Sequence, residues 1–205
     1  MHPVRIKFCG LTRAEDVRAA VTLGVDAIGF NLAKGPRKIT VDQARELAAL
    51  VPPFVTTVAL FVDADEATIL AAMAATRCQT VQLHGAEPAE LAARLRTRFP
   101  VVKAAAVPDR AALERLRNYP ADAYLLDSPP SGGLTGGTGH AWNHSLLAGV
   151  DLDRPIVLAG GLRAETVAAA ITAVRPFAVD VSSGIEAVPG IKDAVRMRAF
   201  VSACS

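Results

Sequence analysis

The chain has 205 residues, 51% of them hydrophobic, and its 22 Lys and Arg residues nearly balance its 20 Asp and Glu residues. A net charge of +2 is too small to indicate a nucleic-acid-binding surface, and no apolar run reaches the roughly 18 residues that a membrane span needs. Three scattered cysteines (Cys9, Cys78 and Cys204) argue against a disulfide framework or a thiolate metal site. Together with a polar N-terminus, these features predict one soluble, cytoplasmic domain over residues 1–205.

Short apolar runs rich in β-branched residues recur at near-even spacing along the chain, and each has the length of a strand. Most of them are closed by Gly, Asp or Pro. The predicted strands are Val4–Cys9, Ala27–Asn31, Thr57–Val62, Thr80–His84, Val101–Val107, Ala123–Asp127, Pro155–Ala159 and Ala178–Ser182.

Helical patterns separate these runs. Thr12 with Glu15, and Thr40 with Gln43, have the spacing of capping boxes, and Asp65 is a third predicted N-cap. The predicted helices are Asp16–Leu23, Ala44–Val51, Glu66–Thr76, Pro88–Arg98, Pro108–Arg117, Asn143–Ala148 (the weakest pattern), Arg163–Val174 and Lys192–Cys204.

Strands that alternate with helices must run parallel, because parallel neighbours need a crossover connection. Eight such units leave about 26 residues per unit, close to the minimum for a (β/α)8 barrel. The rival, an open doubly wound sheet, usually stops at about six strands, and no Gly-x-Gly-x-x-Gly follows the first strand. We therefore expect an α/β protein with a TIM-barrel fold.

Side chains alternate between the barrel interior and the helices along each strand. If Val4, Ile6 and Phe8 face the helices, Arg5, Lys7 and Cys9 face inward. The same alternation predicts inward-facing side chains on four other strands, at Gln82, His84, Lys103, Leu125, Asp127, Asp180 and Ser182. Active sites of barrel enzymes lie at the C-terminal strand ends. The polar candidates there are Cys9, Asn31, Gln82, His84, Asp127 and Asp180.

Each candidate also has a purely structural interpretation. Cys9 could be a small buried hydrophobe, and Asp127 could cap the turn that follows it. His84 could be a turn histidine. Asp180 could balance a lysine of the interior.

Loops after the strands supply further candidates. Gly160-Gly161 and Ser183-Gly184 follow the last two strands, where backbone N–H groups commonly bind phosphate, although glycines also make tight turns. Arg37 is suited to hold a carboxylate bidentately, the alternative being a solvated basic turn. Residues 131–139 contain five glycines and could form a lid or an idle linker.

These residues resemble the phosphoribosylanthranilate isomerase family of tryptophan biosynthesis over nearly the full chain, in the family's motif order. The matching motifs are Lys7-Phe-Cys-Gly10, Gly35-Pro-Arg37, Val81-Gln-Leu-His-Gly85, Leu125-Leu-Asp-Ser128, Gly136-Gly-Thr-Gly139, Gly160-Gly-Leu162 and Arg175-Pro-Phe-Ala-Val-Asp180, the last continuing to Glu186. One departure is His140, where the family usually has Lys or Arg; its charge depends on pH.

The resemblance implies an Amadori rearrangement of N-(5′-phosphoribosyl)anthranilate to the corresponding 1-deoxyribulose 5-phosphate, without metal or cofactor. It makes Asp127 the general acid at the furanose ring oxygen and Cys9, as thiolate, the general base at C2′. Because a thiol titrates at about 8.5, Cys9 needs a nearby positive charge, and Lys7 is a possible source. Substrate contacts are expected from Arg37 (to the anthranilate carboxylate), Gln82, His84 and Asp180 (near the anthranilate nitrogen). Phosphate contacts are expected from Gly160, Gly161, Ser183 and Gly184.

Two other functions compete with this one. The first is a related phosphosugar isomerase barrel, including a bifunctional enzyme of the histidine and tryptophan pathways. Those relatives place a carboxylate where this chain has Cys9, and they tend to be longer. The second is a non-catalytic phosphate-binding barrel. The expected partner is a small phosphosugar, with no nucleic acid or membrane, and the chain could be a monomer or a homodimer.

Overall fold

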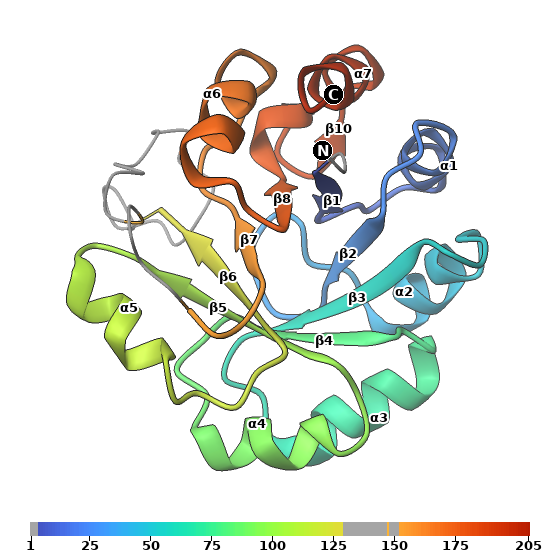
Figure 1. The fold of residues 1–205 in the computed structure, drawn as a ribbon. Helices are drawn as coiled ribbons and strands as arrows, with labels where there is room; N and C mark the ends of the chain where they lie inside the picture. Colours follow the sequence, from blue (N-terminus) through green and yellow to red (C-terminus); the bar gives the residue numbers. More distant parts are fainter. Residues whose placement is uncertain (1–3, 129–146, 148–151) are drawn as a thin grey trace.

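The computed structural model describes residues 4–128, 147 and 152–205, and eight of the described strands close into a parallel barrel ringed by helices (Figure 1). The strands pair in sequence order, and β1 pairs with β8 to complete the ring. They are β1 (Arg5–Cys9), β2 (Ala27–Asn31), β3 (Thr56–Phe61), β4 (Thr80–Leu83), β5 (Val101–Ala106), β6 (Ala123–Asp127), β7 (Ile156–Leu158) and β8 (Ala178–Val181). The TIM-barrel prediction is confirmed, and each predicted strand end lies within one residue of the observed end.

The helices lie outside the barrel. They are α1 (Ala14–Thr22), α2 (Val41–Ala48), α3 (Glu66–Thr76), α4 (Ala89–Arg96), α5 (Arg110–Leu116), α6 (Ala164–Val174) and α7 (Ala194–Ala203). The predicted helix Asn143–Ala148 (apart from Leu147), the predicted lid 131–139 and His140 fall outside the described residues. No helix in the described part of the chain is both long and apolar enough to span a membrane.

The predicted caps of α2 and α3 are present, but that of α1 is wrong. Thr40 and Gln43 form the expected capping box, and Asp65 accepts the backbone N–H of Thr68. Thr12 instead donates its hydroxyl to the carbonyl of Gly190, and α1 begins at Ala14 without a side-chain cap. A contact with a distant segment has replaced the local one.

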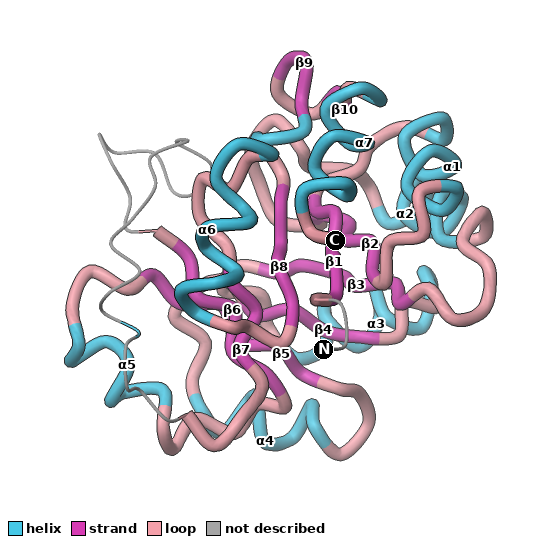
Figure 2. The backbone as a smooth tube through the Cα atoms, turned by 45° about the horizontal axis from the view of Figure 1, so that its top comes forward, coloured by secondary structure: helices cyan, strands magenta, loops and turns pink. Residues whose placement is uncertain are grey.

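A short hairpin after β8 has no counterpart in the predictions. The 3-10 turn η2 (Ser183–Ile185) leads into β9 (Glu186–Val188), which pairs antiparallel with β10 (Ile191–Lys192). Figure 2 shows the hairpin at the edge of the molecule, beside α7. Lys192 was predicted to begin the last helix; it belongs to β10, and Asp193 caps α7 through two backbone N–H groups.

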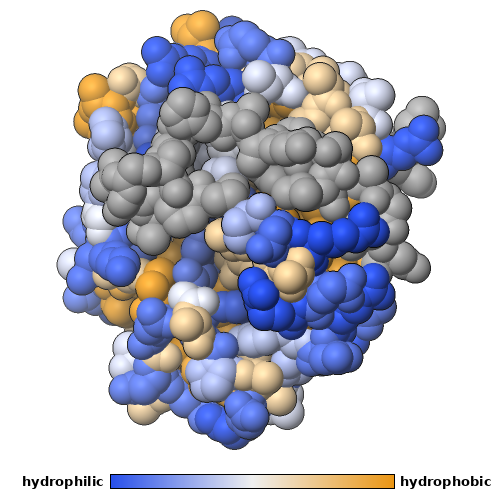
Figure 3. All heavy atoms as spheres, turned by 90° about the vertical axis from the view of Figure 1, so that its left-hand side faces the viewer, coloured by the Kyte–Doolittle hydropathy of each residue, from blue (hydrophilic) through white to orange (hydrophobic). Residues whose placement is uncertain are grey.

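Apolar side chains form two layers. A large cluster between barrel and helices contains Phe8, Tyr124 and Leu126, and a smaller one inside the barrel contains Ala104, Leu125, Val157, Ala159 and Ala178. Hydrophilic residues predominate on the face in Figure 3, and hydrophobic ones appear there in small groups. The apolar interior stops below the C-terminal strand ends, where polar residues replace it.

Lys103 corrects one inward assignment. Its neighbour Ala104 belongs to the interior cluster, so Lys103 points outward into the helix layer. There its Nζ lies 2.6 Å from Glu87 Oε2, 2.6 Å from the Gly85 carbonyl oxygen and 5.4 Å from the centre of the Tyr119 ring. A buried cation is tolerated there because a carboxylate and a carbonyl oxygen satisfy it.

Removing the Glu87 charge should leave the Lys103 ammonium buried in the helix layer without a counterion. The Glu87 side chain is 1% exposed and that of Lys103 is 8% exposed. We expect Glu87→Gln to lower the free energy of unfolding in urea by about 3 kcal/mol. The matched control is Glu66→Gln in the exposed Glu66–Arg94 pair, where the loss should stay below about 1 kcal/mol. Equal losses in the two variants would contradict this account.

Candidate active site

A cavity of about 310 Å³ opens at the C-terminal ends of the barrel strands. The structure brings to it all six polar candidates and the proposed carboxylate-binding arginine. These are Cys9, Asn31, Arg37, Gln82, His84, Asp127 and Asp180. Six strands or the loops after them contribute to its wall, so the cavity depends on closure of the barrel.

The thiol of Cys9 lies beside a buried ion pair. Lys7 and Asp180 are register partners on β1 and β8, and Lys7 Nζ lies 2.7 Å from Asp180 Oδ1. Gly29, opposite Cys9 on β2, makes the room: a Cβ there would lie 3.0 Å from Cys9 Sγ and 3.1 Å from Lys7 Nζ. Sequence reasoning missed Gly29, although a glycine inside a strand often marks a close approach of this kind.

Burial and charge act in opposite directions on these groups. Burial raises the pKa of the Cys9 thiol and Lys7 lowers it, but the net effect is a raised pKa. For Lys7, burial lowers the pKa, yet the charge of Asp180, joined by that of Cys9 where the thiol is ionised, outweighs it and the net pKa is raised. At neutral pH, Lys7 is therefore charged and Cys9 is a thiol. The predicted influence of Lys7 on Cys9 has the expected sign, but burial is stronger.

Asp127 faces a histidine across the cavity. His84 Nε2 lies 3.6 Å from Asp127 Oδ2, while Gln82 Nε2 lies 3.0 Å from His84 Nδ1. With Gln82 donating to Nδ1, the proton of a neutral His84 lies on Nε2, directed at Asp127. Asp127 Oδ1 accepts the N–H of Ser128 at 2.7 Å. The structural interpretation of Asp127 as a turn cap thus describes one of its oxygens, and the other faces His84.

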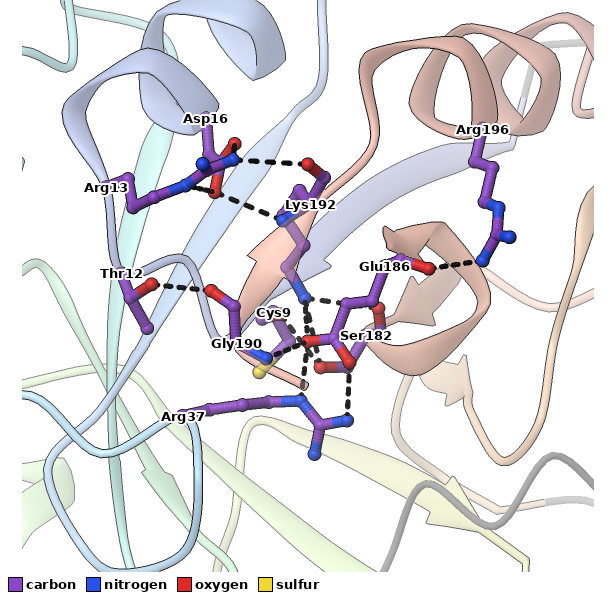
Figure 4. Close-up of polar contacts among 10 residues, drawn as sticks. All are labelled: Cys9, Thr12, Arg13, Asp16, Arg37, Ser182, Glu186, Gly190, Lys192 and Arg196. Carbon is purple, nitrogen blue, oxygen red and sulfur yellow. Dashed lines mark hydrogen bonds and ion pairs between the residues drawn. The ribbon is translucent and has the colours of Figure 1, made fainter. Parts of the chain in front are cut away.

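Arg37 is held rather than solvated. Its Nε and Nη2 each lie 2.7 Å from an oxygen of Glu186, and Lys192 contacts the same carboxylate (Figure 4). Burial raises the pKa of Glu186, but Arg37 and Lys192 outweigh it and the pKa is lowered, so Glu186 is ionised at neutral pH. Site reasoning missed Glu186 and Lys192, since neither lies on a barrel strand.

The four predicted phosphate-binding residues are not among the lining residues of this cavity but adjoin them, since Gly160 packs against Asp127 and Ser183 follows Ser182. Gly160 and Gly161 have φ of 89° and 66°, values that favour glycine. A Cβ on Gly160 would lie 2.4 Å from the Ser128 backbone nitrogen, and one on Gly184 would lie 2.0 Å from the Leu162 carbonyl oxygen. Ser183 is in η2 beside Gly184. These glycines let the loops after β6, β7 and β8 approach one another closely; phosphate contacts there stay a prediction.

Metal binding has no evident ligand set in the described ranges, where no three His, Cys, Asp or Glu side chains are grouped to hold an ion.

Replacing Lys7 with Met should raise the pKa of Cys9 further, because the nearby charge that lowers it is lost. The pKa of Cys9 is measured from the pH dependence of thiolate absorbance and of alkylation by iodoacetamide. In each background the signal of the Cys9→Ser variant is subtracted, so that only Cys9 contributes. Arg5→Met is the control, since Arg5 lies on the same strand and stacks over Phe177. Identical titrations in the Lys7→Met variant and the unaltered protein would rule out Lys7 as the source of charge.

Several known proteins that are similar to this chain along nearly its whole length are N-(5′-phosphoribosyl)anthranilate isomerases. The model of the family described as N-(5′-phosphoribosyl)anthranilate (PRA) isomerase matches residues 6–203. A Pelobacter propionicus protein named N-(5′-phosphoribosyl)anthranilate isomerase is 44% identical over 200 residues, covering 97% of this chain and 94% of its own.

Solved structures agree in fold over nearly the whole chain. The phosphoribosylanthranilate isomerase of Thermotoga maritima is 41% identical with a TM-score of 0.93, covering 98% of each chain. Another structure of such an isomerase, 39% identical with a TM-score of 0.89 and 98% coverage of both chains, is a complex with reduced 1-(o-carboxyphenylamino)-1-deoxyribulose 5-phosphate. Because sequence and structure match along almost all of its length, this chain belongs to the N-(5′-phosphoribosyl)anthranilate isomerase family.

Proposed function

We propose that this chain catalyses the reaction for which its family is named, the aldose–ketose isomerisation of N-(5′-phosphoribosyl)anthranilate in tryptophan biosynthesis. The observation that carries the proposal is the placement of a thiol and a carboxylate in one cavity, Cys9 on β1 and Asp127 on β6. A sugar ring that lies between them can receive a proton from one and lose a proton to the other. The complex of a relative with a reduced aminodeoxyribulose phosphate supports this class of ligand.

The first step opens the sugar ring. Asp127, in its protonated form, gives a proton to the furanose ring oxygen as the bond from that oxygen to C1′ breaks. The lone pair of the anthranilate nitrogen forms the C=N bond of a Schiff base, which leaves Asp127 ionised. We assign His84 and Gln82 to substrate binding, and the Nε2 proton of His84 faces the carboxylate that becomes charged.

The second step moves the proton on carbon. Cys9, as thiolate, removes the proton from C2′, and the electrons of that C–H bond form a C1′–C2′ double bond while the C=N electrons return to nitrogen. The enolamine then tautomerises to the ketone. No external oxidant is needed, because C1′ is reduced as C2′ is oxidised. Asp180 lies next to Lys7 and Cys9, on the side that we assign to the anthranilate nitrogen.

Two anionic groups of the substrate orient it. We assign its carboxylate to Arg37 and its phosphate to the backbone N–H groups of Gly160, Gly161, Ser183 and Gly184. No metal or cofactor enters the proposed steps. We place the reaction in the cytoplasm, and the proposal holds for a monomer or a homodimer; the Thermotoga maritima relative is described as dimeric.

Loss of either proposed proton-transfer group should abolish turnover and leave the fold intact. Cys9→Ala and Asp127→Asn should each lower kcat by about 100-fold or more. The assay follows the loss of anthranilate fluorescence from phosphoribosylanthranilate, and circular dichroism checks the fold.

Cys78→Ala is the matched control, because Cys78 is also buried but does not line the cavity. Near-normal turnover of either site variant would overturn the mechanism, and absence of turnover in the unaltered protein would favour a non-catalytic phosphate-binding barrel. Activity on the histidine-pathway substrate, which we expect to be absent, would favour the bifunctional alternative.

A further inference from the structure

The guanidinium of Arg37 is fixed along one edge by a buried carboxylate. Arg37 Nε and Nη2 donate to Oε1 and Oε2 of Glu186, each at 2.7 Å, in a two-bond fork (Figure 4). The Glu186 side chain is 4% exposed. Such a planar pair fixes the orientation of the guanidinium as well as its position.

Glu186 is itself held by the hairpin that follows β8. Glu186 and Lys192 are register partners on β9 and β10, and Lys192 Nζ, on a side chain with 0% exposure, lies 2.9 Å from Glu186 Oε1. The backbone N–H of Gly190 donates to the same oxygen at 3.2 Å. If the carboxylate rotated away, the buried charge of Lys192 would lose its counterion and keep only its hydrogen bonds to the Ser182 carbonyl and hydroxyl oxygens.

The rest of the Arg37 side chain is also confined. A Cβ on Gly10 would lie 2.7 Å from Arg37 Cδ, so the aliphatic stem packs directly on that glycine. A Cβ on Gly190 would lie 2.9 Å from the carbonyl oxygen of Pro36, which brings the hairpin tip against the loop that carries Arg37. Glycine at both positions allows these contacts.

One edge of the guanidinium is left for a ligand. Glu186 occupies the edge formed by Nε and Nη2, and within the described residues Nη1 has no hydrogen-bond partner. The terminal edge of Nη1 and Nη2 can bind a second carboxylate in a fork. Arg37 lines the cavity that Cys9 and Asp127 share.

We propose that Glu186 is a positioning residue for specificity: it directs the terminal edge of Arg37 at the carboxylate on the aromatic ring of the substrate. This inference rests on the proposed function, since it presumes a substrate with that carboxylate. Glu186 touches no reacting atom and acts through Arg37. Its effect falls on ligands that carry the carboxylate and spares those that lack it.

The test compares two ligands in two variants. The ligands are reduced 1-(o-carboxyphenylamino)-1-deoxyribulose 5-phosphate and the same molecule without the carboxylate, with Kd measured by titration calorimetry. Glu186→Gln keeps the shape but removes the charge. Glu186→Asp keeps a negative charge opposite Lys192, and the retained charge favours folding. The shorter side chain cannot form the two-bond fork to Arg37 at its present geometry.

In both variants we expect Kd for the carboxylated ligand and KM for the substrate to rise about tenfold, with kcat changed less than about twofold. Kd for the ligand without the carboxylate should be unchanged. Arg37→Gln should show the same pattern, and Glu186→Gln added to it should cause little further loss.

Asp122→Asn is the matched control. The Asp122 carboxylate also accepts two hydrogen bonds from an arginine, from Arg96 Nε at 3.0 Å and from Nη2 at 2.6 Å. It lies just before β6, at the end of the barrel opposite the cavity. This variant should leave KM, kcat and both Kd values unchanged. Equal weakening of the two ligands, or no weakening of either, would overturn the positioning role. If the unaltered protein neither isomerises phosphoribosylanthranilate nor binds either ligand, the proposed function fails instead.

Discussion

The ion pair of Lys7 with Asp180 joins the two strands that close the barrel, and the chemistry of the cavity depends on it. The pair lies between β1 and β8 with a separation of 2.7 Å, in a barrel whose interior also holds a cluster of apolar side chains. A charge buried in the barrel interior is stable there only because its partner is adjacent. The same ammonium lies beside Cys9, so one interaction completes the polar layer of the interior and sets the electrostatic surroundings of the proposed base.

The order and the ends of the strands could be predicted because each strand has its own apolar run. Which residues face inward was predictable where one face of the strand is polar, as at Cys9 and Asp180. In β5 the sequence Val-Val-Lys-Ala-Ala-Ala is apolar on both faces, so alternation gives no direction for Lys103, and the buried carboxylate of Glu87 decides it. Thr12 has the sequence of a cap but bonds instead to Gly190, 178 residues away.

The candidate-site residues that lie at the C-terminal ends of barrel strands could be predicted. Those that stabilise one another across the fold, such as Glu186 and Arg37, could not be paired from the sequence. The β9–β10 hairpin is too short to show a hydrophobic period. Glu186 lies 149 residues from its partner Arg37, and the spacing of the two in sequence carries no sign of the contact. Family resemblance extended to Glu186 as a motif residue without giving it a task. Its role became visible only from the fork that it makes with Arg37.

Burial raises the pKa of Cys9, and in the proposed mechanism this has two opposite effects. It lowers the fraction of thiolate at neutral pH, and it makes each thiolate a stronger base toward a proton on carbon. A Lys7 without Asp180 as its partner would lower the pKa of Cys9 more strongly. The thiolate would then form more readily but would be a weaker base. With its charge shared between Asp180 and Cys9, Lys7 supports ionisation of the thiol without removing the basicity that the step at C2′ requires.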